Sequence, residues 1–129
     1  MLKNKIIEGN MGTTNLGKNN KPLLRQILDL IPEHILKDAL HRYQSDKHCS
    51  KYKTYDQLVA IIFGQLNKCL TLREIAQGIS VSPKFLRDIK LEQSPARSTM
   101  GDGNEKRDYR VFEFIFNQLL KYYMNYYKN

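Results

Sequence analysis

The stretch TLREIAQGISVSPKFLRDI, residues 71–89, decides the fold class because it contains two helix start signals in quick succession. Thr71 begins a capping box, in which its hydroxyl accepts the amide of Glu74 and the Glu74 side chain reaches back to the Thr71 amide. Ser82, followed by a proline, is a second start signal. We therefore expect two short helices joined by a tight turn near Ser80.

The spacing within this stretch is that of a helix-turn-helix. Ile75 and Ile79 face inward, the small Ala76 lets a second helix approach, and Leu86 and Ile89 close the core. In such a motif the second helix enters the major groove of DNA, and the side chains near its amino end make the contacts. The candidates here are Ser82, Lys84, Phe85 and Arg87. An ordinary helical hairpin without DNA contacts is the alternative interpretation.

Helical patterns also precede this stretch. Apolar residues recur at steps of three and four over residues 24–31, until Pro32 ends the pattern, and a second apolar face follows over residues 35–43. Residues 44–53 are polar and basic and are predicted to form a loop. Thr54 is expected to cap a third helix that is apolar around most of its circumference, and Gly64 within it indicates a close helix contact. This helix should form the buried centre.

Downstream, Ser98 and Thr99 are expected to cap one last helix that runs to about Tyr127. Its apolar positions fall at steps of four and three and form one stripe, namely Phe112, Phe116, Leu119, Tyr123 and Tyr126. The terminal tyrosines are expected to pack rather than to stack on bases. No stretch shows the alternation typical of a strand. The sequence therefore predicts an all-α, compact bundle of about five or six helices with a helix-turn-helix-like segment and a long C-terminal helix.

Residues 1–21 form a distinct segment, rich in Asn and Gly and poor in apolar residues. We expect a flexible basic arm here, whose Lys3, Lys5, Lys18 and Lys21 can contact phosphate, although a solvated terminus is the simpler interpretation. Residues 22–129 should then form a single helical domain.

The chain has 21 Lys and Arg residues against 13 Asp and Glu, a net charge of +8 that favours polyanionic partners. Its two cysteines, Cys49 and Cys69, form no CxxC pair, so the sequence gives no support for a zinc ribbon or a thioredoxin-like site. We find no signal-peptide core and no apolar run long enough to span a bilayer. The expected location is therefore cytoplasmic, with no membrane partner.

A second group of basic residues lies near the start of the predicted last helix. If that helix is continuous, Gly103, Lys106, Arg107 and Arg110 share a face opposite the aromatic stripe, and this face can grip DNA. Arg97, Ser98, Thr99 and Asn104 lie close by in the sequence. The alternative is a solvated surface, on which Asp102, Glu105 and Asp108 pair with the cations.

Nothing in the sequence predicts catalysis. Three acids on one helical turn do not form the two-metal site of a DNA-cleaving enzyme, and no phosphate-binding glycine loop is present. His34, His41 and His48 recur every seven residues, which on a helix places them too far apart to share a metal. We therefore expect no catalytic residue, no metal, no cofactor and no small-molecule substrate.

Three motifs together resemble a known family: FGQL at residues 63–66, TLREI at residues 71–75 and RSTMGDGNEKRDYRVFEFIF at residues 97–116. They are similar to the amino-terminal domain of bacterial insertion-sequence DDE transposases, and the resemblance covers about residues 23–120. The chain departs from the family pattern at Gly103, where Ala is usual, and at Pro83. The family pattern falls on Ser98, Thr99, Asn104, Lys106, Arg107, Phe112 and Glu113.

The resemblance implies a domain that recognises the ends of a mobile element and leads into an RNase-H-like catalytic domain, which this chain lacks. The expected function is thus sequence-directed binding of double-stranded DNA, by a truncated transposase or an excised domain. A homodimer of the chain is compatible with this function. The alternative is a helical protein-interaction or dimerisation module that uses the stripe from Phe112 to Tyr126. An exposed stripe would favour that alternative, and a buried one would favour DNA binding.

Overall fold

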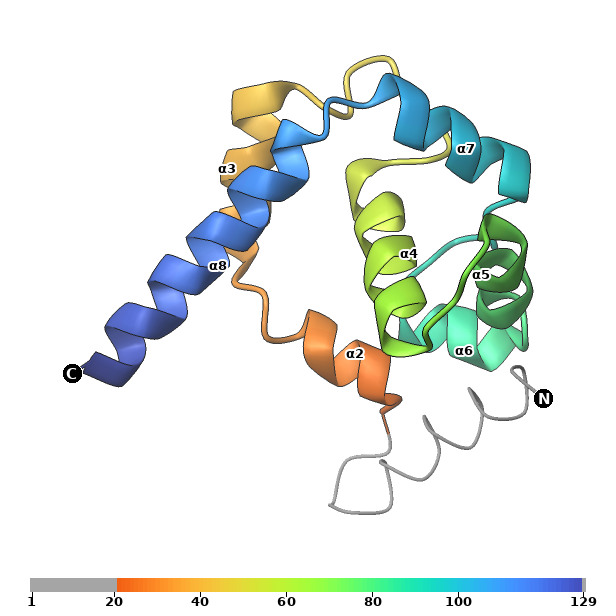
Figure 1. Cartoon of the computed structure of the whole chain (residues 1–129), viewed down its shortest axis with the longest axis horizontal. Coiled ribbons are helices and arrows are strands. Elements are labelled where there is room, and N and C mark those ends of the chain that lie inside the picture. Colours follow the sequence, from red (N-terminus) through yellow and green to blue (C-terminus); the bar gives the residue numbers. More distant parts are fainter. Residues whose placement is uncertain (1–20, 129) are drawn as a thin grey trace.

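The computed structural model describes residues 21–128, which contain helices and no strand (Figure 1). The expected all-α fold with a long C-terminal helix is confirmed, although the described part has seven helices rather than five or six. These are α2 (Leu23–Leu28), α3 (Glu33–Tyr43), α4 (Thr54–Leu66), α5 (Leu72–Ile79), α6 (Pro83–Asp88), α7 (Arg97–Lys106) and α8 (Arg110–Lys128). Most of the arm predicted at residues 1–21 lies outside the described residues.

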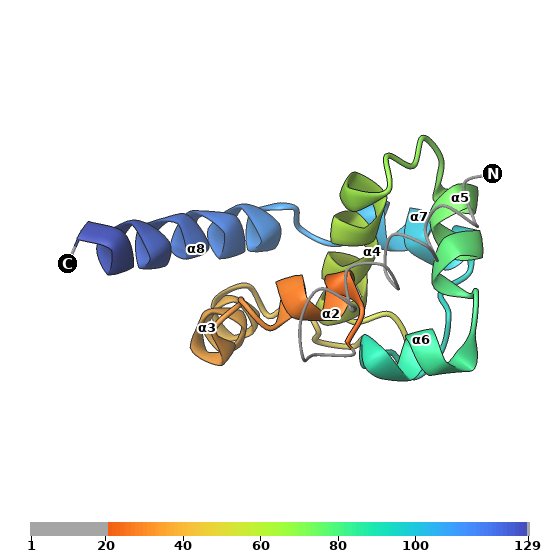
Figure 2. The same cartoon turned by 90° about the horizontal axis from the view of Figure 1, so that it is seen from below.

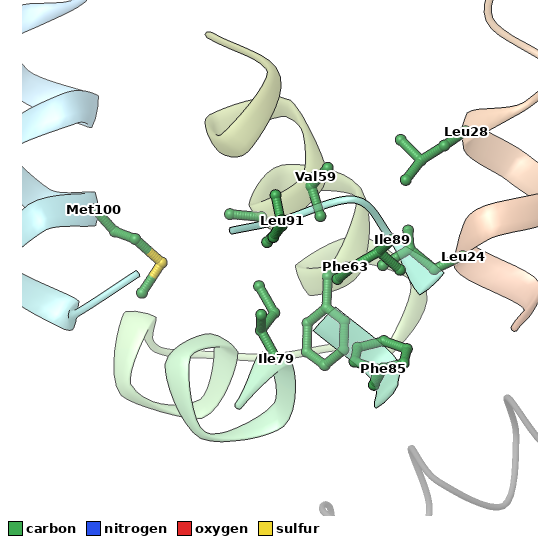
Figure 3. Close-up of a cluster of buried hydrophobic side chains, with 10 residues drawn as sticks. Leu24, Leu28, Val59, Phe63, Ile79, Phe85, Ile89, Leu91 and Met100 are labelled. Carbon is green, nitrogen blue, oxygen red and sulfur yellow. The ribbon is translucent and has the colours of Figure 1, made fainter. Parts of the chain in front are cut away.

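Helix α4 is the buried centre, as predicted, because it contributes to both hydrophobic clusters of the described chain. Its Phe63 packs edge-to-face against Phe85 of α6, with ring centroids 6.2 Å apart, in a cluster that α2, α5 and α7 complete (Figure 3). Its Leu58 joins a second cluster between α3 and α8. One central helix therefore joins the two clusters.

The predicted close contact at Gly64 is confirmed. A Cβ atom at this position would lie 2.9 Å from Cδ1 of Ile75, so a larger residue would require the Ile75 side chain to shift. This contact helps to position the α5–α6 pair.

Both start signals in residues 71–89 are confirmed. The Glu74 amide donates to Oγ1 of Thr71 at 3.2 Å, and the Phe85 amide donates to Oγ of Ser82 at 3.0 Å. The Glu74 carboxylate, however, accepts the amide of Leu70 instead of that of Thr71. Residues 80–82 separate α5 from α6, so the turn lies where the sequence predicts it.

The prediction of one last helix from Ser98 or Thr99 to Tyr127 is wrong. Helix α7 begins at Arg97, after Ala96, without a side-chain cap, and ends at Lys106. Arg107 is in an extended conformation, and the Asp108 carboxylate then accepts the amide of Arg110, which starts α8 in a new direction (Figures 1 and 2).

The cap of α4 also differs from the prediction. Thr54 is the first helical residue, and both its amide and its hydroxyl donate to Oδ1 of Asp46, at 2.6 and 2.7 Å. The cap is therefore supplied by the preceding loop. Within residues 21–128, no helix combines the length and apolar character required to cross a membrane.

Candidate nucleic-acid interface

Arg107, a candidate DNA contact in the sequence, has a side chain that is only 5% exposed. Its guanidinium donates to Oε1 of Gln57 and to the carbonyl of Tyr52, each at 2.6 Å, and its Nε donates to the carbonyl of Ser45 at 3.2 Å. Cys49 Sγ lies 3.3 Å from Nη2. These contacts tie the break between α7 and α8 to α4 and to the loop of residues 44–53.

Asn104 belongs to the same polar network, because its side-chain oxygen accepts Nε2 of the buried Gln57 at 2.9 Å. Next to it, Gly103 lies directly against the ring of Tyr52, and a Cβ atom there would be 2.6 Å from Cε2 of that ring. The glycine that departs from the family pattern is thus required by the tyrosine in this chain. Asn104 and Arg107, two of the polar family-pattern residues, therefore make internal contacts.

The expectation that Gly103, Lys106, Arg107 and Arg110 share one basic face is therefore wrong. Facing rules for steps of three and four apply only within one helix, and the backbone is extended at Arg107. Lys106 is exposed, Arg107 points inward, and Arg110 pairs with Asp108 at 2.8 Å. The hydrogen bonds from Arg110 lower the pKa of Asp108, as the solvated-surface alternative anticipates for this pair.

A basic groove lies between the loop of residues 44–53 and the carboxyl-terminal end of α7. It has a volume of about 710 Å³, and Arg107 forms part of its wall together with Thr99, Asp102 and Asp108. Its exposed lysines are Lys47, Lys51 and Lys106, and the exposed side chains of His48 and Asp102 also line it. We call the three lysines the groove cations. Among residues 21–128, none of the three lysines in this set has a carboxylate within 4.0 Å.

The sequence predicts Lys106 as a DNA contact, whereas Lys47, His48 and Lys51 indicate only a polar, basic loop. Their basic clustering was visible in the sequence, yet their proximity to α7 depends on the contacts of Arg107 with residues 45–52. Lys51 also lines a second hollow with Lys53 and Lys90, where Asp56 and Glu92 offset part of the positive charge.

The candidate contacts in the helix-turn-helix-like segment differ in their surroundings. Phe85 is buried against Phe63 and cannot reach a base, and Ser82 serves as the cap of α6. Lys84 and Arg87 are both exposed, but Lys84 pairs with Asp88 at 2.8 Å. Helix α6 has only six residues, so it presents few side chains to a partner.

Arg97 and Ser98 lie at the opposite end of α7 from Lys106, and both are exposed. Arg97 lines a shallow surface hollow with Arg73 and Thr71 of the α5 start. The structure therefore does not gather all the predicted site residues. It places Lys106 with the loop lysines, Arg97 with Arg73, and Lys84 and Arg87 on α6.

The aromatic stripe of α8 is only partly buried. Phe112 packs in the core, and Tyr123 donates a hydrogen bond to the carbonyl of Leu30, but Phe116 is 43% exposed and Tyr126 is 68% exposed. The expectation that the terminal tyrosines pack is wrong for Tyr126 and Tyr127, because α8 extends past the elements that would cover them (Figure 2). An exposed apolar stripe is typical of an interaction surface, so this part of α8 favours the interaction alternative.

Within residues 21–128, no three His, Cys, Asp or Glu residues are grouped so that they could hold a metal ion. Burial raises the pKa of the Asp56 carboxyl, which lies on α4 beside the groove.

A family model described as a domain of unknown function (DUF4372) matches residues 19–89, more than half of the chain, from before α2 to the end of α6. No curated protein and no solved structure matches. The matched region includes the loop with Lys47, His48 and Lys51 and the whole α5–α6 pair. Because the match covers more than half of the chain, this chain belongs to the DUF4372 family.

Proposed function

We propose that this chain binds double-stranded DNA and that the groove cations contact the phosphate backbone. The observation that carries the proposal is the convergence of Lys47, Lys51 and Lys106 on one groove beside a buried guanidinium. The net charge of +8 supports the same partner class. Phosphate contacts by lysine supply most of the affinity of a protein for DNA irrespective of sequence.

The acids in the groove wall do not cancel this charge. The groove wall contains two acids: Asp108 is engaged by Arg110, and Asp102 is exposed and forms no salt bridge within residues 21–128, so the three lysines still leave a positive excess. The three lysines therefore remain available for an external anion. Lysine also suits this role because its flexible stem lets a point charge follow a phosphate.

Recognition of element ends, as the resemblance to insertion-sequence transposases implies, requires base contacts in addition. Arg87 is the best candidate because it is exposed on the helix that follows the predicted turn. Arg97 and Ser98 are further candidates at the start of α7. On this proposal the chain acts by binding and does not itself cleave DNA.

Fluorescence anisotropy with a labelled duplex of mixed sequence tests the proposal. The double variant Lys47→Ala/Lys51→Ala should weaken binding, whereas Lys37→Ala/Lys121→Ala removes the same charge from exposed positions on α3 and α8 and should not. Equal losses in the two variants would show that only net charge matters. Selection from a randomised duplex pool, followed by Arg87→Ala, tests base readout: a true base contact loses about 1 to 3 kcal/mol of discrimination.

The exposed end of α8 favours a second candidate function, interaction with protein. The two functions use different surfaces, since the groove cations lie on residues 47–51 and α7. A DNA-binding domain that also associates through α8 satisfies both sets of observations.

A further inference from the structure

The carboxyl-terminal half of α8 presents an apolar face that the described chain leaves uncovered. Phe116, Leu120, Met124 and Tyr127 follow one another at steps of four, four and three, so they form one stripe. Their exposures are 43%, 60%, 51% and 80%. Figure 1 shows this end of α8 extending beyond α3, its neighbour in the fold.

This face also contains a hollow that can accept a side chain from a partner. A hollow of about 350 Å³ is lined by Leu120, Tyr123, Met124, Tyr127 and Lys128. The first four are residues i, i+3, i+4 and i+7 of one helix, which is the arrangement of a hole that accepts a knob from a facing helix. The side chain that fills this hollow must therefore lie opposite Met124 on the facing helix.

We infer that this face pairs with the same face of a second copy of the chain, with the two α8 helices antiparallel about Leu120. The inference deepens the second candidate function by naming its partner. Phe116 lies four residues before Leu120 and Met124 four residues after it, so antiparallel pairing brings Phe116 of the second copy to the hollow. The symmetry repeats this contact on the other copy.

Charge decides the direction of the pair. Glu113 and Lys128 are exposed, and neither forms a salt bridge within residues 21–128. Glu113 lies seven residues before Leu120 and Lys128 eight residues after it, so an antiparallel pair places each beside the opposite charge of the second copy. A parallel pair would instead place Glu113 beside Glu113 of the second copy, which is repulsive.

The area sets the strength of the association. Helix α8 has 19 residues, about 28 Å of helix, and only its second half is free. A stable interface usually buries about 800 Å² on each partner, more than half of one helix supplies. A weak dimer is therefore expected, with a Kd of roughly 1 to 100 µM.

Sedimentation equilibrium of the full chain, from about 5 to about 500 µM, tests the pairing at concentrations around that Kd. The wild type should pass from monomer to dimer, and Leu120→Glu should weaken dimerisation by at least about 100-fold because it buries a charge. Leu70→Glu is the matched control, since Leu70 is 89% exposed on the loop between α4 and α5. Circular dichroism should show equal helix content in all three proteins.

A charge exchange tests the direction. Glu113→Lys should weaken the dimer by about 2- to 10-fold, and Glu113→Lys/Lys128→Glu should restore it. A monomeric wild type at the highest concentration, a dimeric Leu120→Glu protein, or no restoration by the double variant would each overturn the inference. DNA binding by the Leu120→Glu protein is measured in parallel. Because the groove and the α8 face are different surfaces, this measurement tests the groove proposal independently of dimerisation.

Discussion

Nη1 of Arg107 donates a hydrogen bond to Oε1 of Gln57 at 2.6 Å, and this contact joins the break between α7 and α8 to the buried face of α4. Arg107 is thus held by the fold instead of being presented to a partner. The neighbouring Lys106 has the same charge but is exposed. Of these two neighbours, Lys106 is therefore available to a partner, whereas Arg107 stabilises the fold from the interior.

Arg107→Ala should lower the free energy of unfolding by about 2 to 4 kcal/mol, because it leaves Gln57 and the carbonyls of Ser45 and Tyr52 without their donor. Lys106→Ala, the matched control, should change it by less than about 0.5 kcal/mol. Urea unfolding followed by circular dichroism measures both. Equal stability of the two variants would contradict the interior role.

Gly103→Ala should destabilise the fold by about 1 to 3 kcal/mol, because the added Cβ meets the Tyr52 ring. Gly101→Ala provides the comparison within the same helix. Its Cβ would have only an ordinary contact, 3.9 Å from Cδ1 of Leu72, so alanine should stabilise α7 by up to about 1 kcal/mol. Changes of the same sign in the two thermal melts would contradict the packing described here.

Asp56→Asn tests the pKa of a partly buried carboxyl. Burial raises the pKa of Asp56 in the folded state above its ordinary value of 3.8. As pH rises above 3.8, the unfolded state therefore loses its proton first, and the wild type loses stability relative to a variant that does not titrate there. The stability of Asp56→Asn relative to wild type should increase between pH 3.5 and pH 7. A constant difference across that range would show that the pKa is not raised.

Local patterns predicted most of the helices correctly. The start signals at Thr71 and Ser82 need only a side chain and an amide three residues away, so sequence spacing determines them. The central position of α4 followed equally from its apolar circumference. The cap of α4 escaped prediction because it comes from Asp46, eight residues before Thr54 and across a loop.

The candidate site was harder to predict, because facing arguments assumed one helix where there are two. The carboxylate of Asp108 and the extended backbone at Arg107 end that helix, and no periodicity in residues 97–127 reveals this. As a result Arg107 was expected on the surface. The loop residues Lys47 and Lys51 join Lys106 only through the tertiary contacts of Arg107.

The salt dependence of DNA binding tests the central claim most directly, because each lysine that contacts phosphate releases counterions from the duplex. Affinities of wild type, Lys47→Ala/Lys51→Ala and Lys37→Ala/Lys121→Ala for one duplex are measured at several salt concentrations. We predict that the groove variant flattens the slope of log K against log salt by roughly two units, about 0.9 for each lost contact, and that the control variant retains the wild-type slope. A wild-type slope near zero, or equal slopes in the groove and control variants, would contradict DNA binding at the groove cations.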